Sequence, residues 1–117
     1  MKLDLDILEL DLEPIAYKVC RDEGWSVERV DAVELQYRAY LQLVRNHRQS
    51  DGLAPTRDVD IYWHHHLLDS LKYQIDCQAL FGSFLHHYPY SGVFSEADRQ
   101  LQRQRVERSM ALLHELF

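Results

Sequence analysis

The sequence predicts an all-α protein built from about five helices. Apolar residues recur at steps of three and four along most of the chain, which is the pattern of helices with one buried face. Three of these runs follow a residue that can cap a helix, namely Ser26, Thr56 and Ser95. Only 4 glycines and 3 prolines occur in 117 residues, which argues against a loop-rich β-sandwich. A chain of this length fits one domain, so we expect residues 1–117 to form a single helical unit.

The N-terminal segment can be interpreted in two ways. Residues 3–12 alternate apolar and acidic side chains, which is typical of a strand. Leu5 and Leu8 also fit one stripe of a helix, so a short extended segment is only one of two alternatives. Pro14 suits the first turn of a following helix, and Gly24 suits its C-terminal end.

The second helix has a clearer start and end. Ser26 is a good N-cap, and Trp25 can pack on Val30 as a hydrophobic staple. The apolar positions then continue at helical spacing to about Asn46. The stretch from Asn46 to Pro55 is polar and contains Gly and Pro, so we expect a surface loop there.

Two further helices are predicted on either side of Asp69-Ser70. Thr56 can cap the first of them, and the acidic residues of its first turn are favourable against the helix dipole. Asp69-Ser70 interrupts the apolar pattern and can cap the next helix, which we expect to continue to Phe84.

A loop rich in aromatic residues precedes the last helix. Pro89 and Gly92 mark this loop. Ser95, with Asp98 three residues later, resembles a capping box and begins a helix that extends to the end of the chain.

Charge and cysteine content narrow the classes of function and location. The 13 basic and 19 acidic side chains give a formal net charge of −6, which disfavours a nucleic-acid partner because phosphate binding needs a surplus of Lys and Arg. No apolar stretch is long enough to cross a membrane, and no signal peptide is visible. Cys20 and Cys77 lie far apart without a Cys-x-x-Cys motif, so we expect reduced thiols and a cytoplasmic protein.

Histidine and aspartate are concentrated between residues 58 and 87. Five of the seven histidines lie there, together with four aspartates and Cys77. Imidazole, carboxylate and thiol groups are ligands of zinc, iron and copper, so the composition suggests a divalent metal ion and no organic cofactor. The chain has no Gly-x-Ser-x-Gly, no His-Glu-x-x-His and no phosphate-binding glycine loop, so no enzymatic reaction is assigned.

Helical spacing selects the primary candidate ligands. Asp60 and His64 are four residues apart and share a helix face flanked by apolar residues, so both side chains should point toward the core. If the helices before and after residue 69 form an antiparallel hairpin, Asp76 lies opposite His64. We therefore predict a metal site made of Asp60, His64 and Asp76 between two antiparallel helices.

Four other residues are secondary candidates for metal binding. His66 is about 200° from His64 around a helix axis, so the two bind one ion only if the segment is extended or the helix ends there. His87 lies roughly 16 Å beyond Asp76 along a continuous helix, so His86 and His87 join the predicted site only if the chain folds back. Cys77 is the fourth candidate, with a small core side chain as the alternative interpretation.

The same residues also allow a purely structural interpretation. A buried His64 hydrogen-bonded to Asp76 would hold the two helices together without any metal. The protein would then be an interaction module, and Tyr88 and Tyr90 would be the first candidates for binding another protein, with packing over the end of the hairpin as the alternative. His65 is expected to be a solvated surface residue.

Residues 58–77 and 80–92 carry a long composite motif, DVDIYWHHHLLDSLKYQIDC followed by LFGSFLHHYPYSG. Its Asp-x-Asp, Trp-His-x-His, Lys-Tyr-x-x-Asp-Cys and Phe-Gly-x-x-Leu-His-His-x-Pro-Tyr elements resemble the glycine-rich domain-containing protein-like family. The chain is similar to a short stand-alone form without the glycine-rich tail, so nothing about that tail carries over. The resemblance implies no particular activity. It does favour as site residues Asp60, His64, His66, Asp76, Cys77 and His87.

Overall fold

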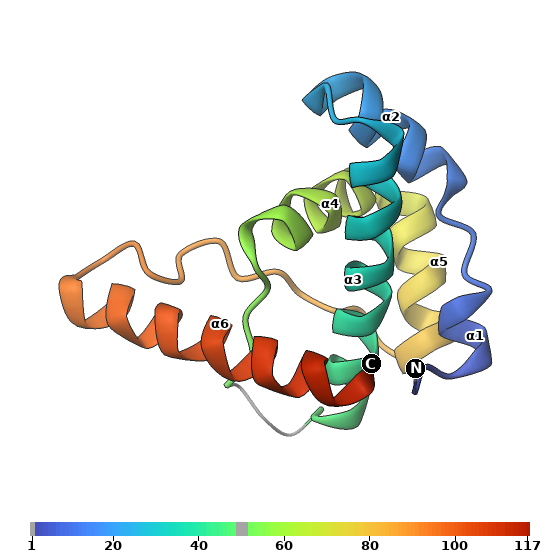
Figure 1. Cartoon of the computed structure of the whole chain (residues 1–117). Helices are drawn as coiled ribbons and strands as arrows, with labels where there is room; N and C mark the ends of the chain where they lie inside the picture. Colours follow the sequence, from blue (N-terminus) through green and yellow to red (C-terminus); the bar gives the residue numbers. More distant parts are fainter. Residues whose placement is uncertain (1, 49–51) are drawn as a thin grey trace.

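The computed structural model describes residues 2–48 and 52–117, and in these ranges the chain contains α-helices and no strands (Figure 1). The helices are α1 (Leu5–Leu8), α2 (Glu13–Glu23), α3 (Val27–Asn46), α4 (Arg57–Leu68), α5 (Ser70–Phe81) and α6 (Glu96–Leu116). The all-α prediction is therefore confirmed. Within the loop predicted from Asn46 to Pro55, residues 49–51 lie outside the described residues.

The helix starts follow the capping signals of the sequence. The hydroxyl groups of Ser26, Thr56 and Ser95 each accept a hydrogen bond from the backbone N–H three residues further on. Pro14 lies in the first turn of α2, and Gly24 ends that helix with a φ of 70°, in the left-handed region that glycine adopts without strain. No helix in the described part of the chain is both long and apolar enough to cross a membrane.

Of the two alternatives for residues 3–12, strand or helix, the structure shows a short helix. These residues form the single turn α1 and an irregular connection to α2, and the described part of the chain contains no second strand that could pair with them. Ile7 is fully buried, and the Arg38 guanidinium donates a 2.7 Å hydrogen bond to its carbonyl oxygen. Arg45 forms ion pairs with Asp4 and Asp6. The prediction of about five helices did not count this short turn, which brings the number of helices in the described residues to six.

The central helix is α3, which contacts α1, α2, α4 and α6. The main core consists of side chains from α1 to α5 packed around it, and its buried members are Ile7, Leu12, Ile15, Val19, Trp25, Val30, Val33, Tyr37, Tyr40, Leu41, Val59, Tyr62, Trp63, Tyr73, Cys77 and Leu80. A smaller cluster of Ala39, Leu43 and Leu116 joins α3 to the end of α6. The first half of α6 projects away from the other helices (Figure 1).

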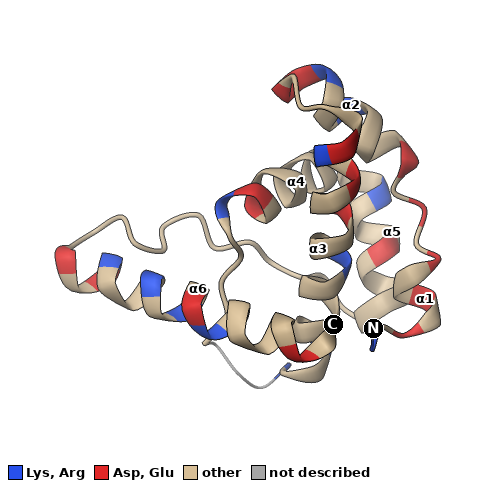
Figure 2. Ribbon diagram, viewed as in Figure 1, with Lys and Arg blue, Asp and Glu red and all other residues tan. Residues whose placement is uncertain are grey.

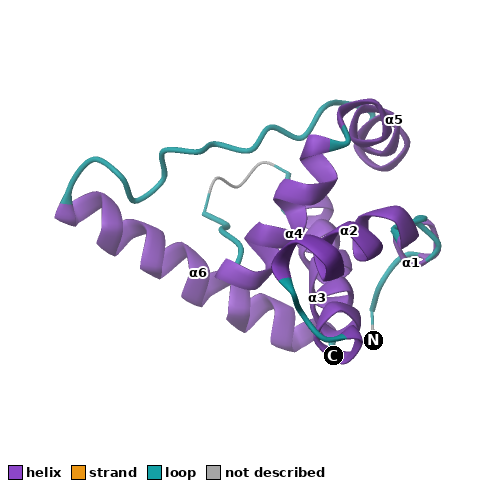
Figure 3. Cartoon of the chain, turned by 90° about the horizontal axis from the view of Figure 1, so that it is seen from above, coloured by secondary structure: helices purple, strands orange, loops and turns teal. Residues whose placement is uncertain are grey.

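The arrangement of α4 and α5 differs from the predicted antiparallel hairpin. In Figure 1, α4 runs across the view and α5 runs down it, so the chain turns a corner at Asp69. The predicted continuation of α5 to Phe84 is wrong, because Gly82 takes a left-handed φ of 69° and ends the helix after Phe81. Residues 82–95 then run without a helix from α5 to the start of α6 (Figure 3).

Candidate metal centre

The histidines of α4 point to different sides of that helix. About half of the His64 side chain is exposed (49%), whereas His66 is only 2% exposed. Successive helical residues are about 100° apart, so positions 64 and 66 lie on nearly opposite faces, as the spacing predicted. As a result, α4 contributes to two separate groups of polar side chains.

The first group, which we call the surface cluster, consists of Asp60, His64 and His87. Nε2 of His87 lies 2.6 Å from Oδ1 of Asp60 and 3.1 Å from Nε2 of His64. Nε2 of His64 lies 3.4 Å from Oδ2 of Asp60. A neutral imidazole can present a lone pair at Nε2, and a carboxylate presents several. The three side chains can therefore direct three lone pairs at one point.

His87 reaches this cluster because the chain folds back after α5. The Tyr73 hydroxyl donates a 2.5 Å hydrogen bond to the Leu85 carbonyl and accepts one of 2.9 Å from Nε1 of Trp63. Burial raises the pKa of Tyr73, so the phenol keeps the proton that it donates. The ring of Trp63 in turn contacts the ring of His87, with 4.4 Å between centroids. The buried tyrosine thus fixes the returning segment beside α4.

The donor separations fit a transition-metal ion. With metal–ligand bonds near 2.0–2.1 Å, two donors of a tetrahedral site are about 3.3 Å apart. The two imidazole nitrogens are 3.1 Å apart, and each lies near one oxygen of Asp60, His87 at 2.6 Å from Oδ1 and His64 at 3.4 Å from Oδ2. These separations are close to that value, so side-chain movements would bring one carboxylate oxygen and both nitrogens to tetrahedral spacing. Two histidines and one carboxylate are also the ligands of catalytic zinc sites and of Fe(II) sites, in which further coordination positions stay open.

The second group, which we call the buried cluster, consists of Tyr37, His66 and Asp76. Nδ1 of His66 lies 2.7 Å from the Tyr37 hydroxyl, and Nε2 lies 2.8 Å from Oδ2 of Asp76. Burial raises the pKa of Tyr37 well above its ordinary value, so this hydroxyl donates to Nδ1. The neutral tautomer with its proton on Nε2 then donates to Asp76, and both ring nitrogens have partners.

Electrostatics keep His66 in this neutral form. Burial lowers the pKa of His66, and it outweighs the hydrogen bond to Asp76, which acts in the opposite direction. The ammonium group of Lys72 lies 3.1 Å from Oδ2 of Asp76 and balances the charge of that carboxylate. The buried cluster is therefore complete without a metal ion.

The predicted grouping of Asp60, His64 and Asp76 has to be corrected. Asp76 does not meet His64, because the corner between α4 and α5 brings it to the opposite face of α4, where it bonds to His66. The third member of the surface cluster is instead His87, which the sequence admitted only if the chain folded back. Asp60 and His64 lie together as their spacing of four predicted, but the prediction that both side chains point toward the core is wrong, since the Asp60 side chain is 33% exposed and the His64 side chain is 49% exposed.

The other candidate residues lie apart from the surface cluster. His86 is exposed, and its ring contacts Phe84. Cys77 is buried in the apolar core, as its structural interpretation expected. His65 was predicted to be solvated but is only 7% exposed, because α2 packs against α4. Its Nε2 lies 2.9 Å from Oε2 of Glu23, whereas its buried Nδ1 has no hydrogen-bond partner.

Tyr88 and Tyr90 belong to an exposed aromatic patch, which also includes Phe94. Tyr88 is 62% exposed and Tyr90 is 52% exposed. Their ring centroids are 5.6 Å apart, and Tyr90 stacks on Phe94 at 5.7 Å. These tyrosines therefore contact each other and solvent.

A cleft of about 750 Å³ lies next to the surface cluster. Its lining comes from the end of α3, the connection to α4, the first half of α4, the segment after α5 and the middle of α6. Asp60 and His87 belong to this lining. A molecule in the cleft would therefore lie beside two of the three candidate ligands.

Sequence comparison relates this arrangement to known proteins. The profile of one family, described as UCP032817-like, matches residues 16–111, which is most of the chain. The chain belongs to the UCP032817-like family. The matched range contains every member of the surface cluster and of the buried cluster.

A curated relative of this UCP032817-like chain is a longer plant protein. It is "Glycine-rich domain-containing protein 2" of Arabidopsis thaliana, which is 29% identical over 77 residues. The alignment covers 63% of this chain and 10% of the relative, so the chain spans only about a tenth of the relative's length. The similarity confirms the resemblance found in the motifs of residues 58–92. No solved structure matches the chain significantly.

Proposed function

We propose that this protein binds a divalent transition-metal ion through Asp60, His64 and His87. The observation that carries the proposal is the convergence of one carboxylate oxygen and two imidazole nitrogens, all within 4.8 Å of one another. Nitrogen donors favour zinc, iron or copper over magnesium and calcium, which prefer an all-oxygen set.

The surroundings of the surface cluster support binding of a ligand by such an ion. Three protein ligands leave at least one coordination position of a zinc ion open, as in catalytic rather than structural zinc sites. The exposed edge of His64 and the cleft beside Asp60 and His87 give water or a small molecule access to this position. Water activation is the chemistry that a zinc ion in such a site supplies.

Calorimetric titration of metal-free, untagged protein with Zn²⁺, and with Fe²⁺ under anaerobic conditions, tests this proposal. We expect one ion per chain. His64→Ala and His87→Ala should each lower the affinity by roughly 100-fold or more, since even residues that only orient a metal ligand are worth about 10–100-fold. His86→Ala is the matched control, because His86 precedes a ligand in sequence but lies outside the surface cluster.

Two results would overturn the metal assignment. One is the absence of saturable binding of any of these ions to the wild-type protein. The other is equal loss of affinity in His86→Ala and His64→Ala, which would indicate weak binding to exposed histidines in general. Because about half of the His64 side chain is exposed, its truncation should leave the fold intact, and this can be checked by circular dichroism.

A second candidate function is recognition of another protein through the exposed aromatic patch. Tyrosine is enriched in protein interfaces because its ring buries a large area while its hydroxyl keeps a hydrogen bond. Tyr88→Ser combined with Tyr90→Ser should then abolish capture of a partner that binds the wild type. Tyr17→Ser is the control, since Tyr17 is equally accessible but lies on α2. Unchanged capture by the double variant would remove this candidate.

A further inference from the structure

The cleft beside the surface cluster has the size and the mixed lining of a small-molecule site. Its volume of about 750 Å³ lies within the range of roughly 300–1,000 Å³ that is usual for ligand pockets. Tyr40, Trp63 and Leu85 supply aromatic and aliphatic wall. An organic molecule with an apolar body could therefore bury that body against this side of the cleft.

The charge of the lining is opposite to that of the whole chain. The formal net charge of the protein is −6, yet the described residues that line the cleft include three arginines and only one carboxylate, that of Asp60. These arginines are Arg48 just after α3, Arg57 in the first turn of α4, and Arg105 in the middle of α6. Figure 2 shows the basic positions at the start of α4 and along α6. A cleft of this composition attracts anions.

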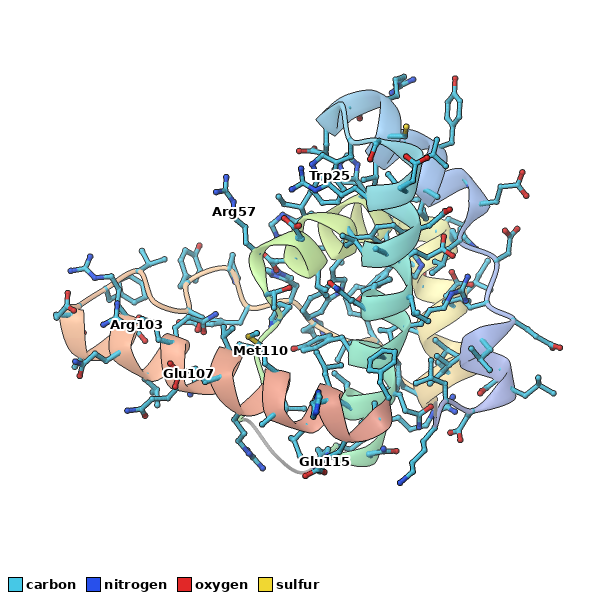
Figure 4. All side chains as sticks on the ribbon, in the orientation of Figure 1. Trp25, Arg57, Arg103, Glu107, Met110 and Glu115 are labelled. Carbon is cyan, nitrogen blue, oxygen red and sulfur yellow. The ribbon has the colours of Figure 1, made fainter. Side chains whose placement is uncertain are left out.

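Two of these arginines differ from the other described arginines, because they have no interaction partner among the described residues. Arg57 and Arg105 form no hydrogen bond or ion pair with any described residue, whereas each remaining arginine in residues 2–48 and 52–117 has an interaction partner. Arg105 is half-buried, and Arg57 projects outward from the first turn of α4 at the rim of the cleft (Figure 4). Their guanidinium groups are free to bind a ligand.

We propose that the cleft binds a small organic anion with a carboxylate or phosphate group. The guanidinium groups of Arg57 and Arg105 pair with its oxygen atoms, since the planar guanidinium matches carboxylate and phosphate geometry. Its apolar body packs against Tyr40 and Trp63. A second polar group of this anion would lie beside Asp60 and His87, and this part of the inference rests on the proposed metal site. The arginine contacts do not depend on the metal site.

Titration with three small probes tests this inference. Benzoate and phenyl phosphate carry the two candidate anionic groups, and benzyl alcohol is a neutral analogue of similar size. The readout is the indole N–H resonance of Trp63, which lines the cleft, with the indole N–H of Trp25 as an internal reference because Trp25 lies outside the lining. We expect saturable shifts of the Trp63 resonance with one or both anions and none with benzyl alcohol.

Charge-neutral variants identify the binding groups. Arg57→Gln combined with Arg105→Gln should weaken binding of the anion at least about tenfold, because hydrogen bonds to charged groups are worth this much or more. Arg103→Gln should change it less than about twofold, because Arg103 is paired with Glu96 outside the cleft. Equal binding by the wild type and the double variant would overturn the inference, as would the absence of saturation with both anions.

Repeating the titration with and without Zn²⁺ separates this inference from the proposed metal site. Arginine-dependent binding of the anion in metal-free protein supports the anion site even if calorimetry finds no metal binding. Conversely, if one zinc ion binds and neither anion shifts the Trp63 resonance in either form, the anion site is wrong and the metal site stands.

Discussion

Two histidine–aspartate groups lie on opposite faces of α4, and they differ in what surrounds each imidazole. In the buried cluster, both nitrogens of His66 have partners, and the residue is only 2% exposed. In the surface cluster, the nitrogens of His64 and His87 face each other and a carboxylate at the edge of a cleft. The same residue types therefore form a completed structural network on one face and an open donor set on the other.

The difference follows from the helical position of each histidine. A shift of two residues along α4 moves an imidazole from a half-exposed face into contact with the core. A buried imidazole has to be satisfied within the fold, since an unpaired polar group in the core costs about 1–3 kcal/mol. The imidazole of His64, about half of which is exposed, has no such requirement, so it remains available for a ligand. We therefore expect mutations in the buried cluster to change stability and mutations in the surface cluster to change binding.

The largest effect should come from truncating the buried histidine. His66→Ala leaves Asp76 and Tyr37 without their partner and removes a ring from a packed site, so we expect a loss of about 3–5 kcal/mol in the free energy of unfolding. Urea denaturation measures this loss. His64→Ala is the matched control and should change stability by less than about 0.5 kcal/mol. Equal destabilisation by the two variants would contradict the distinction between the clusters.

The next effect concerns stabilisation by a bound ion. At a free Zn²⁺ concentration about 100 times the dissociation constant, linkage adds about 2.7 kcal/mol to the free energy of unfolding. Urea denaturation with and without Zn²⁺ should show this gain for the wild type and for His86→Ala. The gain should disappear in His87→Ala. Stabilisation of His87→Ala by the same amount as the wild type would mean that the ion binds elsewhere.

Tyr73→Phe should have an intermediate effect on both stability and metal affinity. The Tyr73 hydroxyl connects the core to the segment that carries His87. Loss of the hydroxyl leaves Nε1 of Trp63 and the Leu85 carbonyl without this partner, at a cost of about 1–3 kcal/mol. It should also weaken Zn²⁺ binding, because the segment carrying His87 loses its anchor.

Tyr62→Phe supplies the control for this change. The Tyr62 hydroxyl donates a 3.0 Å hydrogen bond to Glu34, so its removal also costs stability. That bond is not part of the connection to His87, and metal affinity should therefore stay the same. A similar decrease of metal affinity in both tyrosine variants would show that general destabilisation, and not the anchor, determines binding.

The smallest effect is the pH dependence contributed by His66. Its pKa in the folded protein is lowered from the ordinary value of 6.5, so the unfolded chain binds more protons in the interval between the two values. This contribution to stability is fully present above pH 6.5 and is lost as the pH falls toward the lowered pKa. A proton NMR titration of the imidazole measures the pKa directly. A value at or above 6.5 would contradict the neutral, doubly bonded form of His66.

The sequence predicted the helices well because their signals are local. The caps at Ser26, Thr56 and Ser95 depend on residues within one turn, and so does the pairing of Asp60 with His64. The single turn α1 was left open between strand and helix, because an alternating pattern of ten residues fits both. What decides between the two is that residues 2–48 and 52–117 contain no strand to pair with this segment.

The grouping of the histidines could not be predicted, because it depends on how helices cross. An antiparallel hairpin and a corner after Asp69 fit the same sequence, yet they assign Asp76 to different histidines. The position of His87 depends on a hydrogen bond from Tyr73 to a backbone carbonyl, and no side-chain pattern reports such a bond. His65 gave no sign of burial either, since only the packing of α2 covers it.

The span between Asp60 and His87 would give a bound metal ion a further effect on the folded chain. An ion held by both residues would act as a removable cross-link that closes a loop of 27 residues. Such a clip reduces the conformational freedom of the open chain, with a benefit that grows slowly with loop length. It would also restrain residues 82–95, and with them the start of α6. Metal supply would then determine how rigidly one end of this protein is held.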